Sequence, residues 1–173
     1  PPGHHAEKDE ATGFCIFNNI AVGVAHALNH YKLKRIAIID FDAHHGNGTE
    51  NIFLNDKRVL FCSSFQYPFY PFNLEKTSSD HIIYIPLPAG TSGMTFREDV
   101  EMLWLDQIKN FKPDMLFISA GFDGYIKDNM SDLLLRVEDY AWISQKLKEI
   151  ADEYCKGRIV SVLEGGYALD GLG

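Results

Sequence analysis

The chain has 173 residues, 46% hydrophobic and 23% charged, which is typical of a globular protein with one sizeable core. Its net charge of −8, with no cluster of basic residues, disfavours nucleic acid as a direct partner, because phosphate binding requires a stripe of Lys or Arg. No apolar run approaches the ~20 residues of a membrane span, so no membrane partner is expected. The three cysteines are far apart, which disfavours a disulfide scaffold and favours a cytoplasmic location, or a nuclear one in a eukaryote. The oligomeric state cannot be inferred.

In chain order, the hydrophobic pattern alternates between helical and extended spacing after an opening loop that ends near Gly13. The predicted helices cover residues 16–31, 49–54, 95–111 and 136–154. The predicted strands cover residues 35–41, 59–63, 81–87, 115–120 and 158–163. Strands and helices that alternate in this way favour an α/β fold: an open, mainly parallel sheet flanked by helices, in a single domain over residues 1–173.

Polar or aromatic groups follow four of the predicted strands. They are Asp42 and His44, the 63–72 segment, Asp123, and Tyr167. The carboxyl ends of parallel strands meet at one edge of a sheet, where ligands bind, so these groups are expected to form a single site. The aromatic segment 65–72 is either a packed surface loop or one wall of an apolar substrate channel, and its place after a strand favours the wall.

Two carboxylates and one imidazole are candidates for binding a metal ion. Asp42 and His44 are two positions apart, so in an extended backbone their side chains point the same way, and Asp123 follows a neighbouring strand. Three such ligands with a fourth position left open are typical of catalytic zinc, although Fe(II), Mn(II) or Co(II) would also fit. The alternative interpretation, a polar strand end with chance histidines, leaves carboxylates buried without partners, which is costly.

Water activated by a metal ion also needs a base, and His4 and His5 are the available pair. Asp40 could orient one imidazole and Asn47 the other. Tyr167 could donate its hydroxyl to a developing oxyanion. Taken alone, the two histidines could equally lie in an exposed loop, and tyrosines after strands are common.

Five motifs occur along the chain. They are Pro2-Gly3-His4-His5, Gly13-Phe14-Cys15-Ile16-Phe17-Asn18-Asn19, Asp40-Phe41-Asp42-Ala43-His44-His45-Gly46-Asn47-Gly48-Thr49, Ala120-Gly121-Phe122-Asp123 and Glu164-Gly165-Gly166-Tyr167. Together, and in this order, they resemble the zinc-dependent histone deacetylase family. The similarity is greatest to its class II and bacterial deacetylase-like branch, which includes acetylpolyamine amidohydrolases and acetoin-utilisation proteins. The resemblance implies the arginase/deacetylase fold and a partial catalytic core, truncated at both ends.

The resemblance also implies roles for individual residues. Asp42, His44 and Asp123 would bind one catalytic Zn²⁺. In the tandem pair His4 and His5, His5 would be the general base and acid. Tyr167 would polarise the acyl carbonyl, and Phe14 and Tyr70 would form the walls of an acyl-lysine tunnel. The carbonyl of Gly13 would accept a hydrogen bond from the substrate amide. A structural K⁺ would lie near Asp40, Asp42, His44 and Ser63. Asn47 replaces the aspartate of class I members, a class II trait, and a neutral amide stabilises imidazolium less than a carboxylate does.

The implied activity is metal-dependent hydrolysis of an acyl amide on an N-acyl-lysine of a protein or peptide, or on an acetylpolyamine. One alternative is a catalytically silent scaffold that binds acyl groups. Another is an arginase-like metallohydrolase, which would need a carboxylate where this chain has Gly46. An Asp-x-Asp phosphatase, suggested by Asp40 and Asp42, would leave the histidines without a use.

Overall fold

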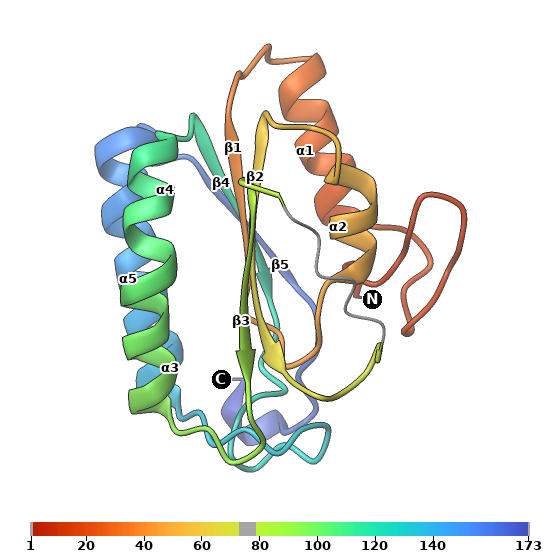
Figure 1. Ribbon diagram of the computed structural model, residues 1–173, viewed down its shortest axis with the longest axis vertical. Helices are drawn as coiled ribbons and strands as arrows, with labels where there is room; N and C mark the ends of the chain where they lie inside the picture. Colours follow the sequence, from red (N-terminus) through yellow and green to blue (C-terminus); the bar gives the residue numbers. More distant parts are fainter. Residues whose placement is uncertain (1, 73–78, 173) are drawn as a thin grey trace.

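Five parallel strands form one sheet in the order β3-β2-β1-β4-β5 in the computed structural model, which describes residues 2–72 and 79–172 (Figure 1). The strands are β1 (Ile36–Asp40), β2 (Val59–Gln66), β3 (Ile82–Leu87), β4 (Met115–Ala120) and β5 (Ile159–Leu163). All five residues of the central β1 are buried, which explains its continuous apolar run and the absence of the alternation that a half-exposed strand would show.

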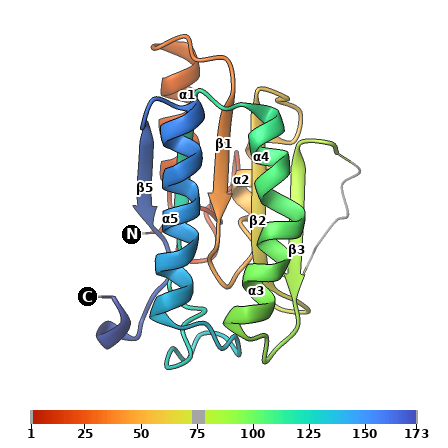
Figure 2. The ribbon, with the colours of Figure 1, turned by 90° about the vertical axis from the view of Figure 1, so that its left-hand side faces the viewer.

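Helices cover both faces of this sheet. One face carries α1 (Asn19–Asn29) and α2 (Asn47–Phe53), on the right in Figure 1. The opposite face carries α3 (Gly93–Val100), the π-helical turn η1 (Glu101–Leu105), α4 (Asp106–Phe111) and α5 (Val137–Tyr154), seen in front of the sheet in Figure 2. A short 3₁₀ turn, η2 (Leu169–Gly171), follows β5. The predicted open parallel α/β fold is therefore confirmed.

Apolar side chains of β1 alternate between two hydrophobic clusters, one on each face of the sheet. Ile36 and Ile38 belong to the cluster under α1, which includes Ile20. Ala37 and Ile39 belong to the larger cluster, which includes Trp104. Two packed faces fix the register of β1, because a slip of one residue would exchange its two sets of side chains.

The register brings the ends of the strands together at one edge. Asp40, the last residue of β1, pairs with Ser63 of β2 on one side and with Ser119 of β4 on the other. The segments that follow β1, β2, β4 and β5 consequently leave the sheet at the same edge, at the bottom of Figure 1. This edge contains the predicted convergence of polar loops.

Two predicted boundaries were wrong in an informative way. The first helix starts at Asn19 instead of residue 16, because the side chain of Asn18 caps its first turn, and Ile16 is 69% exposed instead of joining the core. Strand β2 runs on to Gln66, so Phe65 belongs to the sheet and not to the aromatic loop. Other helix and strand ends differ from prediction by one or two residues.

Two further observations concern the cysteines and the helices. Cys15, Cys62 and Cys155 are all buried and unpaired. Within residues 2–72 and 79–172, no helix combines the length and the apolar character needed to cross a bilayer.

Candidate active site

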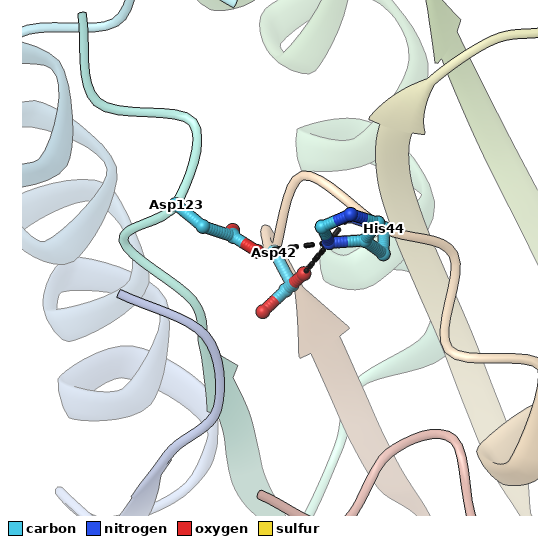
Figure 3. A group of neighbouring side chains, drawn as sticks. All are labelled: Asp42, His44 and Asp123. Atoms are coloured by element: carbon cyan, nitrogen blue, oxygen red, sulfur yellow. Dashed lines mark hydrogen bonds and ion pairs between the residues drawn. The ribbon is translucent and has the colours of Figure 1, made fainter. Parts of the chain in front are cut away.

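Asp42, His44 and Asp123 lie together beyond the ends of β1 and β4 (Figure 3). The Nδ1 atom of His44 is 3.1 Å from Asp42 Oδ1 and 2.8 Å from Asp123 Oδ2. One potential ligand atom from each residue lies within 4.8 Å of the other two. The structure thus brings together the three residues that were predicted as metal ligands.

Backbone hydrogen bonds hold the two carboxylates in place. Gly165 donates its N–H to Asp42 Oδ2 at 2.8 Å, and Ala43 donates its N–H to Asp123 Oδ1, also at 2.8 Å. Gly121 must be glycine, because a Cβ atom there would lie 2.1 Å from Asp42 Oδ2 and 2.4 Å from the Asp42 Cα atom. The segments after β1, β4 and β5 are therefore locked to one another through these carboxylates.

The electrostatics of this cluster favour a cation. Burial alone would lower the pKa of His44, but hydrogen bonds from its imidazole to Asp123 and Asp42, with their charges, raise that pKa to about 9. Two buried carboxylates that stabilise a protonated imidazole would equally stabilise a divalent metal ion. One nitrogen and two oxygen donors also fit the ligand chemistry of catalytic zinc.

The tandem histidines lie beside this cluster, and each has its own partner. His4 Nδ1 donates to Asp40 Oδ2 at 2.9 Å, and His5 Nδ1 donates to Asn47 Oδ1 at 2.8 Å. Both imidazoles are buried, and their ring centroids are 4.1 Å apart. The alternative of two exposed loop histidines is therefore wrong, and the predicted pairing of Asp40 and Asn47 with the two imidazoles is the one observed.

The two histidines have opposite proton affinities. Burial, together with the charge on His4, lowers the pKa of His5 to about 3. Burial also opposes a charge on His4, but Asp40 and Asp42 raise the pKa of His4 well above its ordinary value. The neutral form of His5 is accordingly favoured near pH 7, whereas Asp40 and Asp42 favour the protonated form of His4 next to it.

Two further carboxylates support the histidines, and neither was assigned a role from the sequence. Glu164, at the end of β5, accepts the N–H groups of Gly3 at 2.6 Å and His4 at 3.1 Å, as well as the Ser119 hydroxyl at 3.0 Å. Glu7 accepts from the side-chain amide of Asn47 at 2.7 Å. Glu164 opens the motif that ends in Tyr167, which was a usable signal, but no pattern marked Glu7.

A cavity of about 550 Å³ opens over the cluster. Its lining residues are Pro2, His4, His5, Gly13, Phe14, Asp42, His44, Phe69, Tyr70, Phe72, Asp123, Asn129, Met130, Gly165 and Tyr167. The predicted substrate-binding residues Gly13, Phe14 and Tyr70 are all part of its wall. Asn129 and Met130, in the loop between β4 and α5, were not predicted to belong to the site.

Tight backbone geometry shapes one side of this cavity. Gly13 has φ +54°, and a Cβ atom there would lie 2.4 Å from the imidazole of His5. Next to Gly13, the hydroxyl groups of Thr12 and Tyr70 share a hydrogen bond of 2.9 Å. This bond joins the loop that contains Gly13 to the loop that contains Tyr70, whose ring centroid lies 5.0 Å from that of His5.

Tyr167 lies at the edge of the cavity with 47% of its surface exposed. Burial, together with the charges of Asp123 and Asp42, raises the pKa of its phenol, which therefore stays protonated and able to donate a hydrogen bond. Its backbone N–H donates to Asp128 Oδ2 at 2.6 Å. Tyr167 is thus brought to the same cavity as the three clustered residues.

His45, for which no function was predicted, lies in a buried polar network. His45 Nδ1 lies 3.0 Å from the Ser63 hydroxyl, and its Nε2 donates to Glu50 at 2.6 Å. Tyr84 also donates to Glu50, at 2.6 Å. This network joins α2 to β2 and β3 behind the site, which explains a second histidine directly after His44.

A family model supports the identity of this site. The histone deacetylase domain model matches residues 1–173, the whole chain. This chain belongs to the histone deacetylase family. The motifs that carried the resemblance in the sequence are the segments that converge on the cavity.

Proteins named as deacetylases in distant organisms are similar to this chain. It is 38% identical to histone deacetylase 14, chloroplastic, of Arabidopsis thaliana, over 99% of this chain and 42% of that protein. It is 40% identical to a probable deacetylase of Archaeoglobus fulgidus, over 99% of this chain and 49% of that protein. The chain thus spans about half the length of these relatives.

A solved structure shares the deacetylase fold. The crystal structure of the HDA15 HD domain matches with a TM-score of 0.89 and 32% sequence identity, over 99% of this chain and 50% of that one. The arginase/deacetylase-like architecture expected from the sequence is therefore confirmed.

Proposed function

We propose that this chain is the catalytic core of a zinc-dependent deacylase that hydrolyses the acyl amide of an N-acyl-lysine or an acetylpolyamine-type amine. One observation carries the proposal. Asp42, His44 and Asp123 converge beneath a cavity into which the neutral His5 also faces. Membership of the histone deacetylase family agrees with it.

In this proposal Asp42, His44 and Asp123 hold the zinc ion. When bound, zinc supplies Lewis acidity, which makes a water molecule more nucleophilic and the acyl carbonyl more electrophilic. His5 takes a proton from the attacking water at Nε2, since its Nδ1 proton is held by Asn47. The same imidazole then returns a proton to the leaving amine nitrogen as the amide C–N bond breaks.

Tyr167 stabilises the negative charge that develops on the carbonyl oxygen. Its protonated phenol lines the cavity and can donate a hydrogen bond as that charge forms. His4, hydrogen-bonded to Asp40, favours its protonated form, and its charge adds to burial in keeping His5 neutral. The different roles of His4 and His5 follow from the opposite shifts of their pKa values.

The aromatic residues of the cavity wall suit a substrate with an apolar stem. Phe14 and Tyr70 flank the way to the clustered residues, and the carbonyl of Gly13 can accept the substrate N–H. Such a channel accepts the methylene chain of an acyl-lysine or an acetylpolyamine. The protein's partners would then be acylated proteins, peptides or polyamines, encountered in the cytoplasm or, in a eukaryote, in the nucleus.

The rival functions have less support in the structure. A Cβ atom at Gly46 would lie 2.3 Å from Asp40 Oδ2, so a bridging carboxylate for an arginase-like second metal does not fit there. A catalytically silent scaffold that binds acyl groups would not need the hydrogen bonds by which Asp40 and Asn47 orient His4 and His5. A structural K⁺ near Asp40, Asp42, His44 and Ser63 also belongs to the proposal, on the strength of the family resemblance.

Hydrolysis of an acetyl-lysine peptide and of an acetylpolyamine by zinc-loaded protein tests the proposal. We expect release of acetate from at least one of them, loss of turnover with a chelator, and recovery on adding zinc. Zinc-loaded protein that binds an acylated peptide without cleaving it would favour the scaffold instead. Zinc-loaded protein with neither binding nor turnover would contradict both.

A further inference from the structure

The Tyr167 hydroxyl needs a fixed position, and its own side chain does not provide one. The residue is half exposed, and the described residues offer its hydroxyl no hydrogen bond. Two glycines precede it, and Gly166 has φ +143°, a conformation rarely adopted by other residues. The position of the phenol therefore depends on what holds the backbone at Tyr167.

One carboxylate holds that backbone. Asp128 Oδ2 accepts the N–H of Tyr167 at 2.6 Å and the N–H of Ala168 at 2.8 Å. Its other oxygen, Oδ1, accepts the N–H of Met130 at 3.0 Å. Asp128 is 8% exposed, so these three bonds satisfy an otherwise costly buried charge.

The segment that carries Asp128 is anchored independently of these bonds. The Ser131 hydroxyl donates to the carbonyl of Asp123 at 2.7 Å, and Asp132 exchanges two hydrogen bonds with Gln66, of 2.7 and 3.0 Å. Asp128 thus joins Tyr167 to a loop that is fixed directly to Asp123 and to β2. Removing its carboxylate would release Tyr167 while the loop keeps its other contacts.

We propose that Asp128 is a positioning residue, which fixes the backbone of Tyr167 so that the phenol is held over the clustered residues before substrate binds. The inference rests on the role proposed above for Tyr167. Fixing a hydrogen-bond donor in advance matters because a displacement of about 1 Å at a reacting group can cost ~100-fold in rate. The effect should appear in kcat more than in KM, since the interaction strengthens in the transition state.

Amide hydrogen exchange in the metal-free protein tests the tether without any activity. In Asp128→Ala we expect the Tyr167 and Ala168 amides to exchange at least ~10-fold faster than in wild type. Asp128→Asn should retain much of the protection, because one amide oxygen can still accept both N–H groups. The matched control is Glu138→Ala, which removes an exposed carboxylate at the start of α5 and should leave both amides unchanged.

Steady-state kinetics of the zinc-loaded protein test the consequence. We expect Asp128→Ala to lower kcat by about 10- to 100-fold with KM within ~3-fold, and Asp128→Asn to recover most of the loss. When Tyr167→Phe is already present, adding Asp128→Ala should lower kcat by less than ~3-fold, because the hydroxyl that Asp128 positions is already absent.

The outcomes separate the two proposals. Unchanged exchange in Asp128→Ala, or a kcat loss of the same size with and without the Tyr167 hydroxyl, would overturn the positioning role. If exchange is accelerated in Asp128→Ala but the zinc-loaded wild-type protein releases no acetate, the proposed deacylase function is contradicted. Asp128 would then be only a structural tether.

Discussion

His5 donates its Nδ1 proton to the side-chain carbonyl of Asn47 across 2.8 Å, and this bond is held in turn by Glu7. A neutral amide orients the imidazole without stabilising its protonated form as a carboxylate would. Burial and the neighbouring His4 then keep the pKa of His5 low, at about 3. Burial and His4 thus keep the proposed general base neutral, while Asn47 orients its ring.

Asn47→Asp should raise the pKa of His5. The base acts when neutral, so the fall of kcat/KM toward low pH should begin at a higher pH than in wild type, by about one pH unit. The measurement is the pH dependence of kcat/KM on an acetyl-lysine peptide. Asn51→Asp is the matched control, because it adds the same charge to α2 next to Lys8 instead of His5. Equal shifts in the two variants would contradict a direct effect on the base.

Asp123→Asn should weaken zinc binding by at least ~100-fold, since loss of even an outer partner of a metal ligand commonly costs 10- to 100-fold. An amide oxygen can still accept the N–H of Ala43, so the fold around the site should persist. Competition against a coloured chelator gives the affinity, and circular dichroism checks the fold. Asp132→Asn, which neutralises a carboxylate on the neighbouring loop, should bind zinc like wild type. Unchanged affinity in Asp123→Asn would place the ion elsewhere.

Tyr167→Phe should keep zinc and lose turnover. Removing one donor to a developing oxyanion commonly costs about 100- to 1000-fold in kcat. The residue is half exposed and its backbone bond to Asp128 is kept, so stability should change little. Metal content, Tm and kcat measured on one preparation separate these effects. Loss of zinc in this variant would mean that the tyrosine supports the metal site and not the carbonyl.

The sequence predicted the fold and the main residues of the site because both depend on local patterns. Alternating strands and helices specify a parallel sheet, and such a sheet brings Asp42, Asp123 and Tyr167 to one edge. The tandem histidines could be interpreted only because five motifs coincided. Gly46 was equally informative about the number of metal ions, since a carboxylate at that position would have indicated a second metal.

Contacts between distant segments could not be predicted from those patterns. Glu164 accepts the N–H of Gly3 from 161 residues away, and Asp128 accepts that of Tyr167 from 39 residues away. Nothing in the local sequence distinguishes Glu164 or Asp128 from other carboxylates in loops or after strands. Only tertiary packing brings the N–H groups of Gly3 and Tyr167 to them. Ile16 was misplaced for a related reason, because the cap at Asn18 decides where the helix begins and hydrophobic spacing does not.

Asp114 provides a pH-dependent test of the fold away from the site. It accepts the N–H groups of Lys34 at 2.8 Å and Arg35 at 3.0 Å, and so joins the start of β4 to that of β1. Burial opposes its charge, but these bonds outweigh burial and lower the pKa of Asp114 below 3.8. A carboxyl group with a depressed folded-state pKa stabilises the fold above the unfolded-state value, and that contribution is lost as the pH falls through the folded-state value.

Asp114→Ala should therefore reduce the free energy of unfolding by about 1 kcal/mol near pH 7, a modest figure because the carboxylate is partly exposed. The difference from wild type should shrink as the pH falls below 3.8, where wild type also loses the charge. Urea unfolding of metal-free protein at a series of pH values measures both. Asp9→Ala, in an exposed loop, should follow wild type throughout. A difference that stayed constant with pH would show that Asp114 acts through packing and not through its charge.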